Sequence, residues 1–506
     1  MPRLVLLAMA LTAVAMAGGN SLWANSVDLG LHYALVVRIT DLGHAPTTVD
    51  PSLGLMNGYP PASHTLAALL GKGLGSPFAG MHLTAVLSLA ALYASLGFVL
   101  GSAPRQHLAV LWLAVPATLV LNRLIVHLEL FGTEIIGNFF FAQLVAQAAA
   151  MAVLATALAA EQAGHSHTLR YALLGFSVPI LAQIHPLPAL EILVVLSLLI
   201  IMDYLRASRS FRRALLMPGL LIVCASVLIT TLSPAFAAIR RNAENDGALP
   251  LIYTPNVTGM VILSGVVMLL SIILLAFWFR SSTSGVEPQN LVHKYWALLG
   301  LAIAALCLFQ AIMLMLGLGS PYAVKKYALG LNTVLLLDVP VLLVASRVIR
   351  PLARRAGWPD RAASLAWSSF PAWFLVVAVF TLLPPVSARI ASVDEIRPLE
   401  RFAMAHRDPH PGINAGKYDY AVGLYPPARV IDFMISIGAL QAPQARNVED
   451  FLWGRPLSNP RRIGRLFSRV GSLPWDVPGC RNLVLPEGFE ILDGSCVLKI
   501  VQGPSE

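Results

Sequence analysis

Long apolar runs separated by short polar stretches are the dominant pattern of this 506-residue chain. A helix needs roughly 20 apolar residues to cross about 30 Å of hydrocarbon, and the pattern predicts about eleven such helices. The predicted segments are residues 2–24, 79–101, 107–122, 138–160, 170–184, 187–204, 214–234, 257–279, 295–318, 328–348 and 365–386. The fifth and sixth are short and are separated only by a break at His185-Pro186. The predicted fold class is an α-helical polytopic membrane protein.

The first apolar run permits two interpretations. Met1-Pro2-Arg3, followed by an apolar stretch that ends in Ala15-Met16-Ala17, resembles a secretory signal peptide. The run continues to Trp23, however, and is long enough to cross a bilayer. We therefore expect an uncleaved first helix.

Two parts of the chain are too long or too polar to be simple connections. Residues 25–78 form a long loop in which 27–37 predicts a helix along the membrane surface and 62–74 a second short helix. Beyond residue 386 the composition becomes mixed polar with many Pro, Gly and Arg residues. We expect a transmembrane bundle over 1–386, which includes the loop 25–78, and a small α+β domain over 387–506.

Composition and charge support a membrane protein with one orientation. Only 12% of the residues are charged, whereas soluble proteins have about 25%. Arg and Lys residues concentrate in alternate loops, which predicts a cytoplasmic N-terminus, an exported loop 25–78 and an exported C-terminal domain. The net charge of +9 follows from this asymmetry and is no sign of nucleic-acid binding. The Ala- and Arg-rich composition favours a bacterial inner membrane with a periplasmic C-terminal domain.

The four cysteines divide into two pairs. Cys224 and Cys307 lie within apolar runs and are expected to be inert packing residues. Cys480 and Cys496 lie in the exported domain, where oxidation is permitted. A bridge between them would close a loop of about 16 residues, worth about 3 kcal/mol. We expect this disulfide to clamp a hairpin of strands over 482–485, 489–492 and 496–500.

Common cofactor signatures are missing. The chain has no phosphate-binding Gly-Lys-Ser/Thr loop, no dinucleotide glycine pattern, no His-Glu-x-x-His and no cysteine pairs with zinc spacing. The sequence therefore assigns no cofactor.

Asp28 is the most informative single residue. It follows the first predicted helix on the exported side, among apolar neighbours. A carboxylate at mid-bilayer costs roughly 3 kcal/mol, so Asp28 is expected at the interface or beside a wet cavity. There it can serve as a general base. The alternative, which spacing alone favours, is an ordinary helix cap.

The layout resembles the C-type glycosyltransferase superfamily, the multi-pass enzymes that use lipid-phosphate-linked sugars and include protein mannosyltransferases and lipid A aminoarabinose transferases. Four features carry the resemblance: Asp28 in a long exported loop, the segment Tyr59-Pro60-Pro61-Ala62-Ser63-His64, the pair His185-Pro186, and an exported domain after the last helix. Many members have an acidic pair after the first helix. Here Asp28 is followed by Leu29, so the subfamily stays open.

The resemblance implies an enzyme that transfers sugar from a polyprenyl-phosphate donor, with inversion, to a glycan, lipid or protein acceptor. Asp28 would take the proton of the acceptor hydroxyl. Cations would stabilise the leaving phosphate, and the candidates are Lys325, Lys326 and Arg38. Contact with membrane lipid headgroups is the alternative for the two lysines.

Further side chains are candidates for acceptor contacts or auxiliary roles. They are Tyr59, His64, Glu129 and Glu134, and either glutamate could instead hold a divalent metal ion with Asp28. Solvated loop charges, and for His64 a satisfied histidine on a helix surface, are the ordinary alternatives. No metal site is assigned.

Asp338 favours a different function. It falls near the middle of the tenth predicted helix, and buried intramembrane acids often mark ion or proton pathways. A transporter or flippase for a lipid or polysaccharide precursor is therefore the alternative, and a non-catalytic scaffold is the third. At 1.5 Å per residue, Asp338 lies roughly 15 Å deep and Gln310 about 12 Å, which predicts a hydrogen bond between them.

Overall fold

The computed structural model describes residues 28–47, 50, 53, 56–103, 108–137, 139–233, 236, 256–283, 291–345, 360–382, 397–398, 400–401, 404–405, 418–422, 463–471, 477–484 and 488–502. The predicted first helix, residues 2–24, lies outside these residues.

Among the described residues, seven helical segments are long and apolar enough to cross a membrane. They are α4 (Pro77–Leu100), α7 (Phe141–Gln162), α9 (Pro186–Arg206), α10 (Arg212–Thr231), α12 (Val257–Thr283), α13 (Leu291–Met315) and the segment Pro321–Leu343, which joins α14 (Pro321–Lys325) to α15 (Ala328–Ala345). The prediction of a multi-pass membrane protein is confirmed. The number eleven is not.

Three predicted segments form helices with shorter apolar parts. These are α5 (Leu108–Leu121), which ends in the π-helical turn η3 (Asn122–Val126), α8 (His167–Ala182) and α17 (Asp360–Leu382). The 16 residues of α8 extend only about 24 Å, less than the hydrocarbon thickness.

The break between α8 and α9 lies where the sequence predicts it. His185 has an extended backbone, and its Nδ1 accepts a hydrogen bond from the backbone N–H of Leu187, at 3.3 Å. Pro186 opens α9, where its missing N–H leaves no intrahelical bond unmade. His185 therefore lies in the break after α8 and caps the N-terminus of α9.

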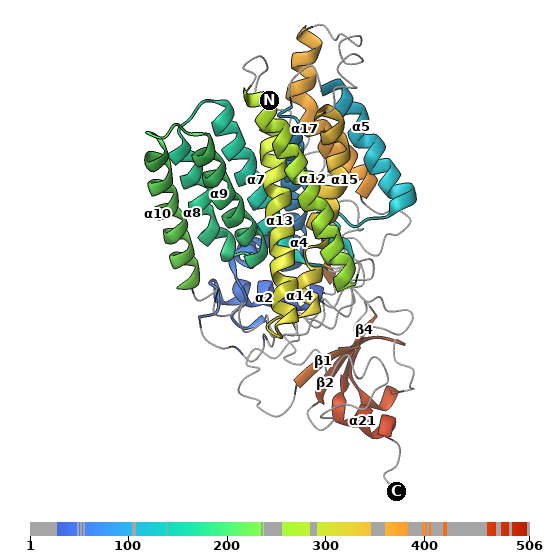
Figure 1. Cartoon of the computed structure of the whole chain (residues 1–506). Helices are drawn as coiled ribbons and strands as arrows, with labels where there is room; N and C mark the ends of the chain where they lie inside the picture. Colours follow the sequence, from blue (N-terminus) through green and yellow to red (C-terminus); the bar gives the residue numbers. More distant parts are fainter. Residues whose placement is uncertain are drawn as a thin grey trace. The chain divides into compact units, whose positions relative to one another are not determined.

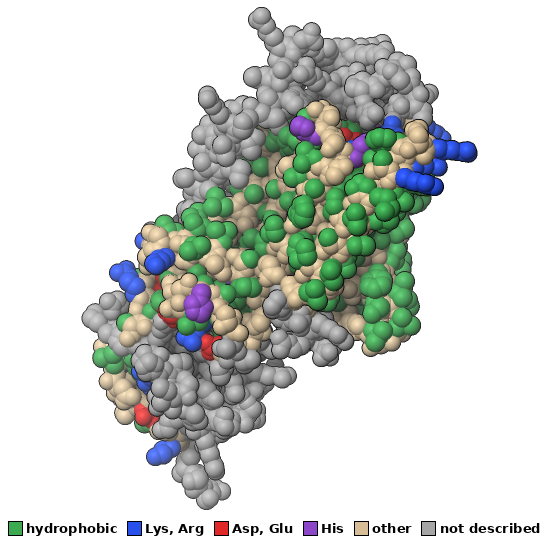
Figure 2. Space-filling model, turned by 90° about the vertical axis from the view of Figure 1, so that its left-hand side faces the viewer, with side chains coloured by type: hydrophobic (Ala, Val, Ile, Leu, Met, Phe, Trp, Pro, Cys, Tyr) green, Lys and Arg blue, Asp and Glu red, His purple; other side chains and the backbone are tan. Residues whose placement is uncertain are grey.

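The bundle presents apolar side chains outward. Figure 2 shows a broad band of hydrophobic side chains on one face, with Lys and Arg side chains gathered beyond its edge. α10 and α12 expose most of their apolar length, as at Leu221 and Ile262. A water-soluble surface rarely carries so large an apolar patch, so this surface is suited to lipid. Figure 1 shows α8, α9 and α10 side by side at one edge of the bundle.

A buried ionic cluster joins four helices at the predicted cytoplasmic end of the bundle. The Lys294 ammonium lies 2.8 Å from Glu161 Oε1 and 3.3 Å from Asp203 Oδ1. Arg170 also pairs with Glu161 and lies 3.5 Å from Asp203. Tyr295 donates a hydrogen bond to Glu161, at 2.8 Å. Arg170 begins the predicted segment 170–184, and its side chain is only 3% exposed inside α8.

The chain forms two compact units. One comprises Met1–Ala15, Val86–Glu134 and Ala142–Pro384, and the other comprises Met16–Ala85, Ile135–Phe141 and Pro385–Glu506. The exported loop of the sequence analysis is thus grouped with the C-terminal residues, and a buried carboxylate explains part of this grouping. Glu400 accepts hydrogen bonds from the Tyr33 hydroxyl at 2.6 Å, from the Phe78 backbone N–H at 2.9 Å and from the Ser76 hydroxyl.

Two short helices of the second unit have the predicted positions. α2 (Asp28–Leu42) buries most of its residues, and α3 (Ala62–Leu74) begins directly after Pro61. The start of α4 crosses α3 very closely, because a Cβ at Gly80 would overlap the backbone of Ala67 and Gly71. Glycine is required at this crossing.

The C-terminal residues include a four-stranded sheet in the order β1-β2-β4-β3. Its strands are β1 (Tyr418–Val422), β2 (Ile463–Arg469), β3 (Arg481–Val484) and β4 (Phe489–Asp493), followed by α21 (Gly494–Gln502). β1 and β2 are parallel, and the other pairs are antiparallel. A helical turn η6 (Pro478–Cys480) precedes β3.

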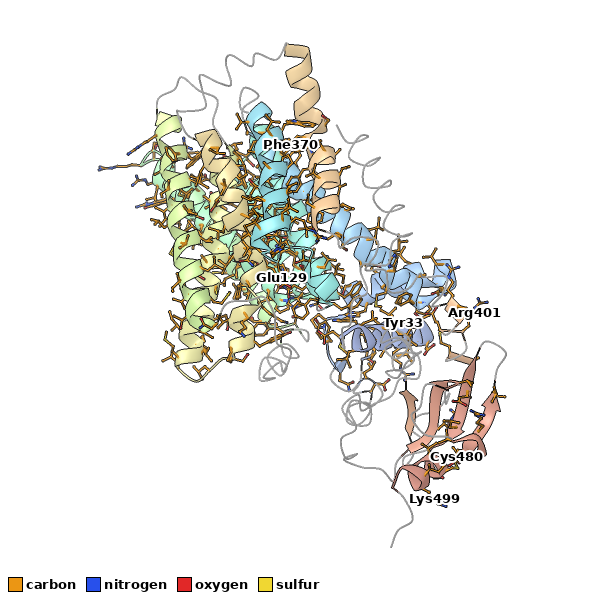
Figure 3. The ribbon with its side chains drawn as sticks, turned by 90° about the vertical axis from the view of Figure 1, so that its right-hand side faces the viewer. Tyr33, Glu129, Phe370, Arg401, Cys480 and Lys499 are labelled. Carbon is orange, nitrogen blue, oxygen red and sulfur yellow. A yellow bond between two sulfur atoms is a disulfide. The ribbon has the colours of Figure 1, made fainter. Side chains whose placement is uncertain are left out.

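The predicted disulfide is present, but the predicted third strand is wrong. Cys480 and Cys496 are bonded, with their Cα atoms 5.5 Å apart, and Figure 3 shows Cys480 near the helix that carries Lys499. β3 and β4 form the expected hairpin, whereas residues from Gly494 onward are helical. Asp493 starts that helix, because its Oδ1 accepts a hydrogen bond from the backbone N–H of Cys496, at 2.8 Å.

Candidate functional site

Asp28 lies in the first turn of α2 and is half-buried. Helix N-termini carry a partial positive charge that favours an ionised carboxylate there. Burial, and secondly the charge of Asp28, raise the pKa of the Tyr59 hydroxyl well above its ordinary value. Asp28 is thus within electrostatic reach of Tyr59. The residue that precedes α2 lies outside the described part of the chain, so the alternative of a helix cap stays a prediction.

Two histidines form a hydrogen-bonded pair one turn along the helix from Asp28. His32 follows Asp28 by four residues, a spacing that puts both side chains on one face of α2. His32 Nδ1 lies 2.8 Å from His64 Nε2, and both residues are buried. Since one nitrogen must donate and the other accept, at least one imidazole of the pair is neutral on its facing nitrogen.

Aromatic rings enclose this histidine pair. The Tyr59 ring stands edge-on to both imidazoles, with centroids 5.5 Å from His32 and 5.6 Å from His64. Phe139 and Phe141 pack beside the pair, and their own centroids are 6.1 Å apart. Figure 3 shows Tyr33 of α2 among crowded side chains in this region. The residues next to Asp28 on its helix face therefore form an apolar wall with few polar atoms.

Burial keeps His64 uncharged. It lowers the pKa of His64 to about 3, against a smaller opposite effect of a hydrogen bond to the Pro60 backbone. The Ser63 hydroxyl lies 3.2 Å from His64 Nδ1. A neutral His64 can donate one hydrogen bond and accept one, but it cannot supply positive charge to a phosphate. His64 is completely buried, and its two ring nitrogens lie at hydrogen-bond distance from His32 and Ser63.

Arg38 is engaged by an acid of its own unit. Its Nε lies 2.5 Å from Asp50 Oδ2, and Asp50 is held in turn by two hydrogen bonds with Asn57, each 2.7 Å. The pair is partly buried, so its charge is largely neutralised before any ligand binds. This weakens Arg38 as a candidate for binding the donor phosphate.

The two candidate lysines belong to the other compact unit. Lys325 ends the short helix α14, and the ammonium of Lys326 lies 4.7 Å from the centroid of the Tyr322 ring. Burial, and secondly the charge of Lys326, keep the pKa of His185 well below its ordinary value. His185 is consequently a neutral cap beside a half-buried cation.

Glu129 and Glu134 differ in environment although they share one loop. Glu129 is half-buried, and burial raises its pKa. Glu134 is 1% exposed, and its Oε2 accepts a hydrogen bond from the Gly132 N–H, at 2.6 Å. Burial is the main reason that the pKa of Glu134 rises to about 7. Its other oxygen, Oε1, has no hydrogen-bond partner among the described residues.

The sequence analysis missed an acid that lies near Glu134. Glu191, on α9, is 4% exposed and accepts a hydrogen bond from Gln147 Nε2 of α7, at 3.1 Å. The charge of Glu134 acts on Glu191. A signal was available, because an acid within an apolar span of a membrane protein is a candidate functional residue by default.

Asp338 is buried as predicted, but its expected partner is wrong. Its Oδ1 accepts a hydrogen bond from Trp296 Nε1, at 2.9 Å, whereas its Oδ2 has no partner in the described part of the chain. The span that holds Asp338 begins at Pro321, about two helical turns before the expected start. Asp338 therefore lies deeper than we counted, at the level of Trp296 rather than of Gln310.

An apolar hollow of about 430 Å³ lies between α4, α7 and α17. Its lining consists mostly of alanines, and Ser95, Phe98, Thr156 and Pro371 complete it. Because most of the lining is apolar, the hollow suits an alkyl or isoprenoid chain better than a polar substrate.

The comparisons with known proteins give no identification. No protein-family model matches the sequence, and no curated protein resembles it significantly. Within the described residues, no group of three or more His, Cys, Asp or Glu side chains is arranged to hold a metal ion. Any function is therefore argued from the geometry of the chain's own side chains.

Proposed function

We propose that the protein is a glycosyltransferase of a bacterial inner membrane that uses a polyprenyl-phosphate sugar, with Asp28 as the general base. The observation that carries the proposal is the position of Asp28, a half-buried carboxylate in the first turn of α2, with Tyr59 in electrostatic reach. The proposed fold is similar to the C-type glycosyltransferases, with loop 25–78 and the C-terminal domain on the periplasmic side.

The proposed reaction is a single displacement. Asp28 removes the proton of an acceptor hydroxyl while the hydroxyl oxygen attacks the anomeric carbon of the donor. The bond from that carbon to the phosphate oxygen breaks, and the electron pair leaves with the lipid phosphate. The configuration at the anomeric carbon is thereby inverted. The partial positive charge of a helix N-terminus favours an ionised carboxylate, which a general base requires.

The surroundings of Asp28 support a site for an uncharged, hydroxyl-bearing substrate. Tyr59 is half-buried and presents both a ring edge and a hydroxyl, which suits contact with a sugar or another acceptor. His64 is too deeply buried to contact a substrate, so we propose that it positions His32 and Tyr59. Lys325 and Lys326 remain the proposed partners of the donor phosphate.

The C-terminal domain is proposed to bind or gate the acceptor. Glu400, with its three hydrogen bonds to Tyr33, Ser76 and Phe78, ties the start of this region to α2 and α4. Tyr33 is five residues from Asp28 on the same helix. An acceptor held by the domain would thus be linked to the helix that carries the base.

The direct test is sugar transfer by purified protein in liposomes that contain a radiolabelled polyprenyl-phosphate sugar. We expect Asp28→Asn to lower the transfer rate by at least about 100-fold, since general bases contribute 10²- to 10⁴-fold. Asp41→Asn, an exposed acid at the other end of α2, is the matched control and should keep the wild-type rate. A folded Asp28→Asn protein that transfers sugar at the wild-type rate would refute the proposal.

Transport of a lipid or polysaccharide precursor is the second candidate. It is favoured by the unpartnered Oδ2 of Asp338, a buried acid within a span that could bind a proton. This function predicts that Asp338→Asn abolishes movement of a fluorescent lipid-linked sugar across liposomes, whereas Asp28→Asn leaves it unchanged. The glycosyltransferase proposal predicts the reverse order of effects on sugar transfer.

A further inference from the structure

Two coupled carboxyl groups lie buried at the predicted exported end of the bundle without a cationic partner. Glu134 and Glu191 are 1% and 4% exposed, and the charge of Glu134 acts on Glu191. Neither forms an ion pair among the described residues. Two buried carboxylates that repel each other cost several kcal/mol unless protons or a cation neutralise them.

Several oxygen atoms on and near these carboxyl groups lack a hydrogen-bond partner among the described residues. Within the described residues, no hydrogen-bond partner reaches Glu134 Oε1, Gln143 Oε1 or the Tyr327 hydroxyl, although all three residues are buried. Gln143 precedes Gln147 by one turn of α7, and Gln147 binds Glu191. The charge of Glu191 reaches the Tyr327 hydroxyl. Among the described residues, the cluster thus combines two acids with the unsatisfied oxygens of two further residues, Gln143 and Tyr327.

The loop that carries Glu134 is built to hold the carboxylate in place. Gly132 has a φ of 97° and donates its N–H to Glu134, and a Cβ at this position would overlap Tyr93. The neighbouring Phe131 is fixed at both ends, since its N–H donates to Thr333 at 2.8 Å and its carbonyl accepts from Tyr93 at 3.0 Å. A preorganised, incompletely satisfied acid indicates a ligand site.

We infer that Glu134 and Glu191 bind one divalent metal cation. Their combined charge of −2 matches such an ion, and carboxylate, amide and hydroxyl oxygens are the ligands that Mg²⁺, Ca²⁺ and Mn²⁺ prefer. Gln143 and Tyr327 supply the additional oxygens. The site lies in the helical bundle, is independent of Asp28, and does not depend on which function the protein has.

Proton competition gives the site a characteristic pH dependence. The pKa of Glu134 is raised to about 7 by burial, so a proton occupies this group when no metal is bound at lower pH. The titratable groups that interact with Glu134 or Glu191 are Tyr93, Tyr327 and, half-buried in the same loop, Glu129. Affinity for the cation should therefore rise as the pH is raised through about 7.

The test is a titration of the chelator-treated, full-length protein in detergent with Mn²⁺, read as the loss of the electron paramagnetic resonance signal of free Mn²⁺. We expect one Mn²⁺ per chain, displaced by excess Mg²⁺ or Ca²⁺. Glu134→Gln and Glu191→Gln should each weaken binding by at least about tenfold, because ligand charge sets affinity at such sites. Glu129→Gln is the matched control and should change the affinity by less than about threefold.

Two results would overturn the inference. One is no saturable binding of Mn²⁺ by the wild-type protein at any pH up to about 8.5. The other is binding that both glutamine variants retain, which would place the ion elsewhere. Elution profile and thermal unfolding establish that each variant is folded. If Glu191→Gln does not fold, Gln143→Met serves instead, and unchanged affinity in that variant together with Glu134→Gln counts against the site.

Discussion

The two ends of the helical bundle treat buried acids in opposite ways. At the predicted cytoplasmic end, Glu161 and Asp203 are matched by Lys294 and Arg170, so two negative and two positive charges lie together. At the predicted exported end, Glu134 and Glu191 have no cationic partner among the described residues, and Glu134 Oε1 has no hydrogen-bond partner there.

This difference in charge pairing indicates that the first group of acids stabilises the fold and that the second group binds a ligand. A buried acid that is paired with cations and bonded to tyrosines stabilises one arrangement of helices, because removing any partner leaves a charge uncompensated. A buried acid without a partner destabilises the fold in its ionised form, and such a cost is characteristic of binding sites. We therefore interpret the matched ionic cluster as a structural contact that holds α7, α8, α9 and α13 together. We interpret the unmatched pair, Glu134 and Glu191, as a ligand-binding site.

The largest expected effect on stability concerns the buried ionic cluster. Lys294→Met removes one of the two cations and leaves Glu161 and Asp203 underneutralised, which should destabilise the protein by about 3–5 kcal/mol. Thermal unfolding in detergent measures the loss. The exposed Arg209 of the nearby α9–α10 connection is the control, and Arg209→Met should cost less than about 0.5 kcal/mol. Equal effects of the two substitutions would remove the distinction between the cluster and the surface.

The next expected effect concerns Glu134, whose substitution should stabilise the protein, in contrast to the substitution of Lys294. At a pH below 4.5, the ordinary pKa of a glutamate, Glu134 is protonated in both the folded and the unfolded chain. Folding then buries no charge at this position, so the group does not lower the free energy of unfolding. As the pH rises toward about 7, the unfolded chain loses this proton first, so the folded state is destabilised by up to about 3 kcal/mol. With a chelator present, Glu134→Gln should therefore stabilise the protein at pH ~8 and change little at pH ~5. Stability that is lower than wild type at both pH values would contradict the assignment.

Two tyrosines provide the smallest and most closely matched comparison. Tyr295 donates a hydrogen bond to Glu161, so Tyr295→Phe should cost about 1.5–3 kcal/mol, as is usual for bonds to charged groups. The Tyr327 hydroxyl has no partner among the described residues, and in the absence of metal Tyr327→Phe should cost less than about 0.5 kcal/mol. Calorimetric unfolding of both variants decides the comparison, which fails if the two losses are equal.

Local sequence patterns predicted elements whose determinants are close together in the chain. The positions of α3 and α9, the break at His185 and the Cys480–Cys496 disulfide follow from proline placement, apolar run length and cysteine context. The segment after Asp493 was mistaken for a strand because its apolar run is short. The hydrogen bond of Asp493 to Cys496 decides the helix instead.

Partners that are distant in the chain could not be predicted. The sequence does not show that Lys294 reaches across 91 residues to Asp203, or that Glu400 reaches Tyr33 across 367. The predicted pairing of Asp338 with Gln310 failed for this reason. Asp28 was identified from its position after the first span, but its neighbours His32 and Tyr59 could be assigned only from the structure.

Infrared difference spectroscopy of the carboxyl groups during a pH titration tests most directly whether the two ends differ. In metal-free protein we predict a protonated carboxyl component that disappears with an apparent pKa of about 7, and we expect Glu134→Gln to lack this component while bands of other buried carboxyl groups persist. Added Mn²⁺ should shift this titration to lower pH. Buried carboxyl groups that remain ionised from about pH 5 upward, with no difference between wild type and Glu134→Gln, would contradict the account.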